Sequence, residues 1–178
     1  MSRTPHEIVN PLILARPVGF SHALVAGPGR IVHIGGQHAR RSDGKIVGDG
    51  VVEQFDRALG NMVEALRAAD ARPVHVVDMR VFTTAMKAYR RESATIGTVY
   101  RRYMGRFYPP MSVLGVTDLW DPDALIEVAC TAVVPEVPQY EPMRAAEERD
   151  PVDRAEEALF GESLNPGDFD QNPERGRL

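Results

Sequence analysis

The chain has 178 residues, 43% of them hydrophobic, which suits one domain with a substantial core and a tail better than two domains. Its formal net charge of −4 argues against a nucleic-acid-binding protein, since such proteins usually present a basic surface. The single cysteine, Cys130, excludes an intrachain disulfide, and no apolar run reaches transmembrane length.

The charge is unevenly distributed along the chain. Residues 135–178 contain 12 acidic and 5 basic side chains, a balance of −7, whereas residues 1–134 contain 13 acidic and 16 basic ones, a balance of +3. The N-terminal sequence also lacks the apolar run of a signal peptide. We therefore expect a cytoplasmic protein that binds neither membranes nor nucleic acid.

Residues 1–17 are predicted to be an N-terminal arm, in which residues 12–15 form an edge strand or simply an ordered segment. Residues 20–26 and 30–37 are predicted to pair as a hairpin, because the Gly-Pro-Gly sequence between them favours a type II turn. The second strand ends in Gly35 and Gly36. This pair indicates either close approach of a ligand or subunit to the backbone, or a bulge at the strand end.

A helix is predicted from Asp49, a suitable N-cap, to about Ala69, since Pro73 cannot continue it. Its apolar residues lie on one side, so the helix should pack on a sheet. A strand follows over residues 74–83, with Val77, Met79 and Val81 expected to face the helices. A second helix is predicted to continue to Phe107, before two prolines.

Residues 108–134 contain two apolar runs around a polar turn at residues 121–123, which predicts two buried strands joined as a hairpin. Alternation in the first strand puts Met111 and Val113 on one face. In the second strand Glu127 is a carboxylate within an apolar sequence. A carboxylate removed from water must be paired, hydrogen-bonded or protonated, which makes Glu127 the leading candidate for a catalytic acid or base.

The predicted order is strand, strand, helix, strand, helix, strand, strand. It indicates an α+β fold in which two helices cover one face of a single sheet. The other face needs water or a second copy of the chain, and the apolar side of Met111 and Val113 favours a second copy. We therefore expect a homo-oligomer.

The sequence resembles the Rid (reactive-intermediate deaminase) family over residues 18–134, through several dispersed motifs in the family's order and spacing. Residues 18–23 resemble the motif G-P-Y-S-x-A, residues 34–37 resemble S-G-Q, Gln54 and Asn61 match a Q-x(6)-N helix, Thr83 ends a typical strand, and residues 125–128 resemble the strand with alternating glutamates.

This resemblance implies a chorismate-mutase-like subunit that forms a homotrimer with ligand clefts between the subunits. It also implies hydrolysis of imines and enamines without a metal or cofactor. In the family an arginine grips the substrate carboxylate and the strand glutamate, here Glu127, positions or activates water. In this sequence Met111 stands at the arginine's position. A thioether offers neither a charge nor a donor to a carboxylate, so the usual amino-acid imines should not be substrates.

Other polar positions of the family's cleft are also replaced, which predicts a more apolar cleft for an uncharged or aromatic small molecule. Phe20 replaces a tyrosine, Gly35 a serine, Gly97 an asparagine and Val113 a cysteine. The predicted ligand-binding residues are Phe20, Gly35, Gly36, Gly97, Met111 and Val113, with Glu127 as the catalytic residue.

Each candidate also has a purely structural interpretation. Glu127 could form an ion pair with a nearby arginine, and Met111 and Val113 could simply pack. Three arginines of the second helix, at positions 101, 102 and 106, could supply a displaced cation or form a solvated face. No metal site is expected, because the spacing of His33 and His38 puts them on opposite faces of a continuous strand. Cys130 is expected to be a core residue.

Residues 135–178 form an acidic, Pro-rich tail, in which residues 151–160 have the capping residues of a short helix. A disordered solubilising tail is the alternative. The tail could contact the more basic body, a neighbouring subunit or a partner protein. The leading hypothesis is a Rid-like hydrolase of altered specificity, and the alternative is a non-catalytic trimer that binds a ligand or a partner.

Overall fold

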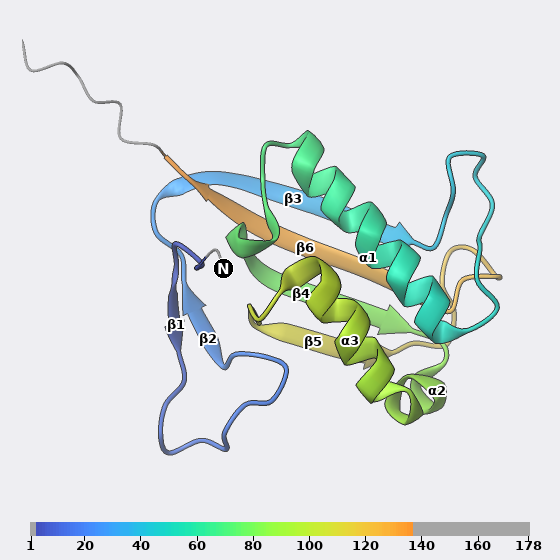
Figure 1. Cartoon of the computed structure of the whole chain (residues 1–178), viewed down its shortest axis with the longest axis horizontal. Coiled ribbons are helices and arrows are strands. Elements are labelled where there is room, and N and C mark those ends of the chain that lie inside the picture. The colour runs from blue at the N-terminus through green and yellow to red at the C-terminus, as the bar shows by residue number, and fades with distance from the viewer. Residues whose placement is uncertain (1–2, 137–178) are drawn as a thin grey trace, which may run out of the picture. The chain divides into compact units, whose positions relative to one another are not determined.

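A four-stranded sheet with helices on one face forms the centre of the protein, as a computed structural model describing residues 3–136 shows (Figure 1). The predicted α+β fold class is therefore confirmed. The elements in chain order are β1 (Glu7–Val9), β2 (Ala23–Val25), β3 (Gly29–His38), α1 (Val51–Ala68), the 3-10 turn η1 (Pro73–His75), β4 (Val76–Thr83), α2 (Met86–Arg91), α3 (Ser93–Met104), β5 (Met111–Gly115) and β6 (Ile126–Pro135).

The strand order is β3-β6-β4-β5, with β4 and β5 parallel and the other neighbours antiparallel. Because β4 separates β5 from β6, the predicted hairpin over residues 108–134 is wrong. The connection over residues 116–125 crosses the end of β4 instead. It can do so because two strand spacings are only about 10 Å, which is much shorter than ten extended residues.

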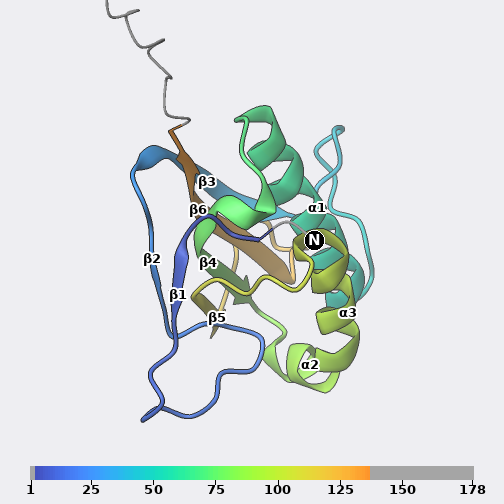
Figure 2. The same cartoon turned by 60° about the vertical axis from the view of Figure 1, so that its left-hand side comes forward.

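The hairpin predicted over residues 20–37 is also wrong. β2 pairs with β1 in a separate two-stranded ladder. β3 pairs instead with β6, the last strand of the described residues. Figure 2 shows the chain turning from this ladder into β3. Residues 12–15 form no strand, and Leu12 and Ile13 are fully exposed, because the loop that contains them projects from the ladder.

Helix α1 forms as its apolar spacing predicts. The Glu53 carboxylate accepts hydrogen bonds from the backbone N–H groups of Asp49 and Gly50, at 2.8 and 3.0 Å, and so caps the first turn. The N-cap is Gly50, one residue after the predicted one. One side of α1 packs against β3 and β6. Its side chains there are completely buried, and they are Phe55, Ala58, Leu59, Met62 and Leu66.

Where a single second helix was predicted, the structure has two helices, α2 and α3, which meet at Glu92. Gly105, at φ +65°, follows α3 and turns the chain toward β5. The Tyr100 hydroxyl donates a hydrogen bond to the carbonyl of Phe107 at 2.8 Å, and burial raises the pKa of Tyr100. The end of α3 is thereby held close to the start of β5.

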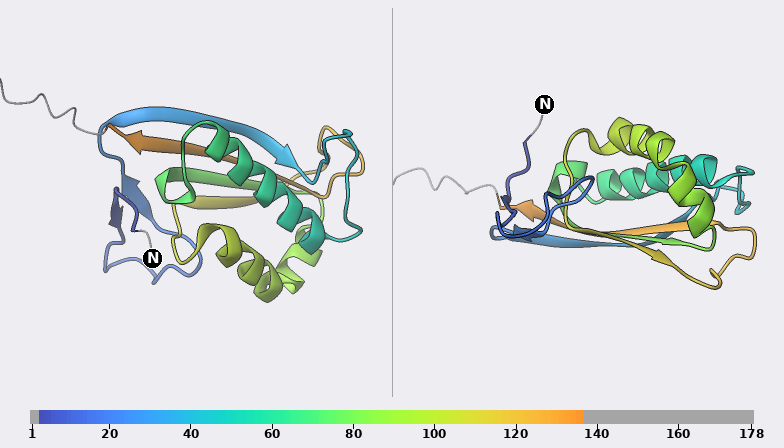
Figure 3. Two further views of the ribbon diagram at one scale, coloured as in Figure 1. Left: turned by 45° about the horizontal axis from the view of Figure 1, so that its top comes forward. Right: turned by 90° about the horizontal axis from the view of Figure 1, so that it is seen from below.

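Both long helices lie on the same side of the sheet (Figure 3). β6 alternates as predicted, with Ile126, Val128 and Cys130 buried under the helices and Glu127 on the uncovered side. Burial raises the pKa of the Cys130 thiol to about 12, so the thiol stays protonated at neutral pH. The prediction that Cys130 is a core residue is confirmed.

One strand departs from simple alternation. The register between β4 and β6 shifts between Val76 and Asp78, so Val76 is fully buried whereas Val77 is only half-buried. Met79 and Val81 face the helices as expected. Within residues 3–136 no helix is long and apolar enough to cross a membrane. The predicted helix at 151–160 lies outside the described residues.

Candidate functional site

Glu127 is the second residue of β6 and lies on the face of the sheet that the helices leave uncovered. The strand register places it between His38 of β3 and Phe82 of β4. Its side chain is 23% exposed, so the carboxylate is partly withdrawn from water but remains accessible. Such a position allows a carboxylate to meet both a water molecule and a substrate.

His38 is the ionic partner of Glu127, with its Nε2 atom 2.9 Å from Oε2. The approach is off the N–H axis of the ring, and within residues 3–136 Nε2 has no hydrogen-bond partner. The two side chains are therefore in contact without an aligned hydrogen bond. The alternative that Glu127 pairs with an arginine is wrong within the described part of the chain.

His38 was not predicted as the partner of Glu127, because a continuous strand would put His33 and His38 on opposite faces. The register between β3 and β6 shifts between Ile34 and Gln37, which adds one residue to β3. This bulge puts His33, opposite Thr131, and His38, opposite Glu127, on the same face. No group of three or more metal-ligating side chains forms anywhere in residues 3–136, however.

Gly36 lies in this bulge and leaves room for the carboxylate of Glu127. A Cβ atom on Gly36 would overlap Oε1 and Cδ of Glu127, whereas a Cβ atom on Gly35 would have no atom within 4 Å. Of the two interpretations of the glycine pair, the bulge is confirmed. At Gly36 the close approach is made by a side chain of the same chain.

We expect the substitution Gly36→Ala to displace the Glu127 carboxylate without unfolding the protein, because the overlap is with the end of a flexible side chain. If Glu127 is the catalytic residue that the sequence predicts, hydrolysis of the expected imine substrates should fall about ten-fold or more, since catalytic groups tolerate little displacement. Gly27→Ala, where a Cβ atom would likewise have no atom within 4 Å, is the matched control and should leave turnover unchanged. The measurements are turnover and the thermal unfolding midpoint of both variants. Equal turnover in the two variants would contradict a catalytic role for Glu127.

The amide of Gln54 on α1 holds the chain that leads into Glu127. Its Oε1 accepts a hydrogen bond from Leu125 N at 2.7 Å, and its Nε2 donates to Asp123 O at 3.0 Å and to Gly48 O at 3.1 Å. Gln54 is 2% exposed, so these bonds are shielded from water. The backbone two residues before Glu127 is thus fixed to the helix.

Asn61, seven residues later on the same side of α1, holds the segment that carries His38. Its Nδ2 donates to His38 O at 2.9 Å and to Arg40 O at 2.8 Å. The two helix amides therefore position both members of the Glu127–His38 pair. Thr83, at the end of β4, adds a hydrogen bond from its hydroxyl to Leu125 O at 2.8 Å.

The remaining predicted ligand-binding residues do not meet Glu127 within one chain. Met111 pairs with Met79 and Val113 with Val81, which places both on the helix-covered face, and Met111 packs against the core. The expectation that they make the uncovered face apolar is wrong, because β5 joins the sheet beside β4 and takes its register. Phe82 and Leu114 occupy the uncovered face beside Glu127 instead.

Phe20 and Gly97 also lie away from Glu127. Gly97 belongs to α3 on the helix-covered side. Phe20 is 38% exposed, and the next residue, Ser21, donates from its hydroxyl to Tyr108 O at 2.6 Å. Phe20 is therefore held close to the start of β5 and Met111. The arrangement within one chain is two separate sets of residues, one around Glu127 and one around Met111.

Comparison with known proteins agrees with this fold. The sequence model of the family described as Endoribonuclease L-PSP matches residues 14–134. The RutC family protein UK114 of Drosophila melanogaster is 30% identical over 135 residues, covering 75% of this chain and 93% of that protein. A crystal structure of a Rid-family protein of unknown function from Yersinia pestis has a TM-score of 0.66 and 32% identity, and the match covers 72% of this chain and 98% of that one.

Proposed function

The chain belongs to the Rid (reactive-intermediate deaminase) family, and from this membership we propose that it hydrolyses a small uncharged imine or enamine with Glu127 as the catalytic base. The observation that carries the proposal is the partly exposed Glu127 carboxylate, with His38 Nε2 at 2.9 Å and Gly36, which has no Cβ atom, next to it. Family membership itself supports a role as a small-molecule deaminase or an endoribonuclease-like enzyme.

In the proposed reaction the substrate, which has no charged group apart from the imine itself, is protonated on the imine nitrogen when it enters. Glu127 takes a proton from water while the water oxygen bonds to the imine carbon, and the C=N π electrons return to nitrogen. The carboxyl group then gives its proton to the nitrogen of the resulting carbinolamine. The C–N bond breaks, ammonia leaves, and the hydroxyl proton passes to solvent as the carbonyl forms. The role of His38 is to orient the carboxylate.

Specificity for an uncharged substrate is proposed from Met111. This residue stands where the family's arginine is expected and cannot form the charge-assisted bonds that bind a carboxylate. Its side chain packs against the core near the start of β5, and Phe20 is held close to the same strand start. These apolar side chains suit a substrate with an uncharged or aromatic side group better than a small imino acid.

An assembly of more than one copy is part of the proposal, because the Glu127 and Met111 sets lie on opposite faces of one sheet, and the family suggests that this assembly is a homotrimer. A cleft containing both requires residues from two copies of the chain. The uncovered face offers Phe82 and Leu114 for such packing, and Leu114 is 41% exposed. The proposed cleft would combine Glu127 and Gly36 with Phe20, Gly97, Met111 and Val113, and Gly35 would border it.

The proposal is tested by ammonia release from imines generated in situ, one series from neutral amines and one from amino acids. We expect a higher kcat/KM for the uncharged series. Met111→Arg should shift the preference toward carboxylate-bearing imines by about ten-fold or more, the value of a charge-assisted contact. Ser42→Arg adds the same charge at an exposed position in a turn and is the control.

A preference for carboxylate-bearing imines in the unmodified protein would reject the proposed specificity. Absence of turnover with both series would favour the alternative, a non-catalytic trimer that binds a ligand or a partner protein. Thermal denaturation of Met111→Arg would establish that the variant is folded, because Met111 contacts the core.

A further inference from the structure

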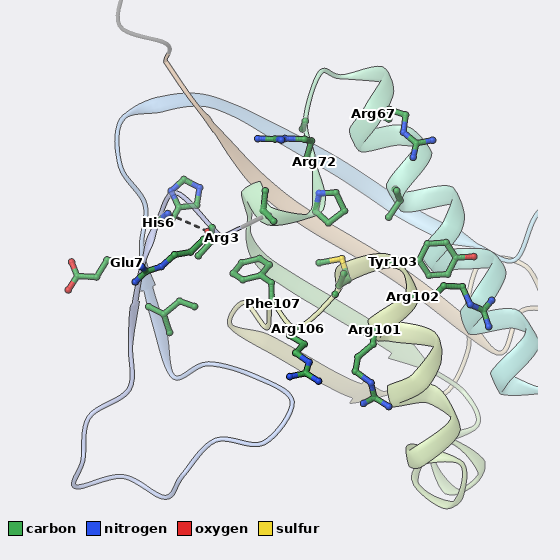
Figure 4. A pocket seen from close by; sticks show the side chains of 18 residues that line it. Arg3, His6, Glu7, Arg67, Arg72, Arg101, Arg102, Tyr103, Arg106 and Phe107 are labelled. Atoms are coloured by element: carbon green, nitrogen blue, oxygen red, sulfur yellow. Dashed lines mark hydrogen bonds between the residues drawn. The ribbon is translucent and has the colours of Figure 1, made fainter. Parts of the chain in front are cut away.

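A cavity of about 1210 Å³ lies between the N-terminal arm, η1 and the C-terminal ends of α1 and α3 (Figure 4). Residues of the arm form one wall, and residues that follow α1 and α3 form the others. Glu127, His38 and Met111 are not among the residues that line it. The cavity is therefore distinct from the site proposed for hydrolysis.

The walls of this cavity are strongly basic. The charged side chains other than histidine that line it are Arg3, Glu7, Arg67, Arg72, Arg101, Arg102 and Arg106. Two of these are neutralised by carboxylates, since Arg67 contacts Glu64 at 2.7 Å and Arg102 contacts Asp56 at 2.8 Å. The other four arginines have no carboxylate partner within residues 3–136, and against Glu7 they leave a balance of +3.

Helix termini explain only part of this concentration of arginines. Arg67, Arg101 and Arg102 lie in the last turns of α1 and α3, where a basic side chain is favourable to the helix dipole. Arg3, on the arm, and Arg106, beyond α3, have no such role. Figure 4 shows Arg3 on the arm and Arg106 on the chain that follows α3, on two different walls.

His6 supplies a second, independent indication of a ligand. It lines the cavity, is 7% exposed, and its Nε2–H donates to the carbonyl of Val133 at 3.0 Å. The other ring nitrogen, Nδ1, has no hydrogen-bond partner within residues 3–136. Because Nε2 carries the proton, Nδ1 is an acceptor, and a ligand that brings a donor such as a hydroxyl group to the arm would satisfy this buried atom and stabilise this conformation.

The lining also has an apolar part that an inorganic ion would not use. Its members are Ile8, Val63, Ala71, Pro73, Met104 and Phe107. Small-molecule sites typically combine such an apolar lining with a few charged groups that orient the ligand. The cavity therefore suits a molecule with an anionic group and an apolar or ring-bearing body.

We propose that this cavity binds a small organic phosphate, with Arg3 and Arg106, which line different parts of it, as the contacts to the phosphate group. The planar guanidinium fork matches phosphate oxygens in bidentate contacts, and phosphate carries more charge than a carboxylate to offset the surplus of arginines. This site is independent of the Glu127 chemistry.

The test is calorimetric titration of the full-length protein with adenosine 5′-monophosphate, adenosine and inorganic phosphate as probes. We expect the monophosphate to bind more tightly than either of the other two. In the double variant Arg3→Gln and Arg106→Gln its Kd should rise about ten-fold or more, as expected for charged hydrogen bonds. The matched control is Arg41→Gln with Arg90→Gln, which removes the same charge from exposed positions outside the cavity.

The control should change the Kd by less than about two-fold, because exposed charges act weakly over a distance. Equal weakening in both double variants, or equal affinity for adenosine and its monophosphate, would overturn the proposal. Tighter binding of a single-stranded oligonucleotide with increasing length would also overturn it, in favour of an extended polyanion surface. Glu127→Gln should bind the monophosphate unchanged, so failure of the hydrolase proposal and failure of this one are distinguishable.

Discussion

Replacing Glu127 with glutamine is expected to lower imine hydrolysis by about 100-fold or more, the usual contribution of a positioned general base. Glutamine has nearly the same size and shape and fits over Gly36, but it cannot accept the proton from water. The effect should appear in kcat rather than in KM, because substrate contacts are retained. The measurement is steady-state ammonia release from the best uncharged imine.

Asp78→Asn is the matched control for this substitution. Asp78 lies on the same uncovered face of the sheet, opposite Thr131, and its carboxylate contacts Arg80 at 3.2 Å on the surface. The same change from carboxylate to amide at this position should leave turnover within about two-fold, as for an ordinary surface substitution. Unchanged turnover in Glu127→Gln would contradict a catalytic role and would support the non-catalytic alternative.

Replacing Gln54 with leucine is expected to lower the free energy of unfolding by about 3 kcal/mol, because it leaves several buried backbone groups without partners. Gln54 is 2% exposed and forms hydrogen bonds with Leu125 N, Asp123 O and Gly48 O. The apolar side chain of leucine replaces the volume but none of these bonds. Urea unfolding at one fixed protein concentration measures the change.

Gln37→Leu is the control for Gln54→Leu. Within residues 3–136 the Gln37 side chain donates only to the carbonyl of Gly35, at 3.2 Å on the surface, so its replacement should change stability by less than about 0.5 kcal/mol. A loss of less than about 1 kcal/mol for Gln54→Leu would contradict the inferred role, since it would mean that water readily replaces the amide. A large loss of stability would establish that the hydrogen bonds of Gln54 hold the loop before Glu127 in place.

The Glu127 site is built by contacts between segments that are distant in sequence. Gln54 holds the loop before Glu127, and Asn61 holds the backbone of His38, so a single helix places both ends of the ion pair. The bulge at Gly36 provides the space in which the carboxylate lies. A small displacement of α1 would therefore change the distance between the two ionisable groups.

Local patterns in the sequence were sufficient to predict several features correctly. The apolar period of α1 and the two-residue alternation of β6 depend on neighbours three, four or two positions away, so these patterns specify which side of each element is buried. They identified the position of Glu127 on the face opposite Ile126 and Val128. The dispersed motifs of residues 18–134 identified the family and hence the fold class.

The order of the strands and the partner of Glu127 were decided only by the tertiary structure. Both predicted hairpins were wrong because hydrogen bonding between strands depends on long-range packing, and β6 pairs with β3 and β4 rather than with its neighbour in sequence. One extra residue at the bulge reversed the predicted face of His38, and pairing with β4 put Met111 on the helix-covered face. Periodicity reports only which side of a strand a residue occupies relative to its own neighbours, whereas register and strand order relate residues that are up to a hundred positions apart.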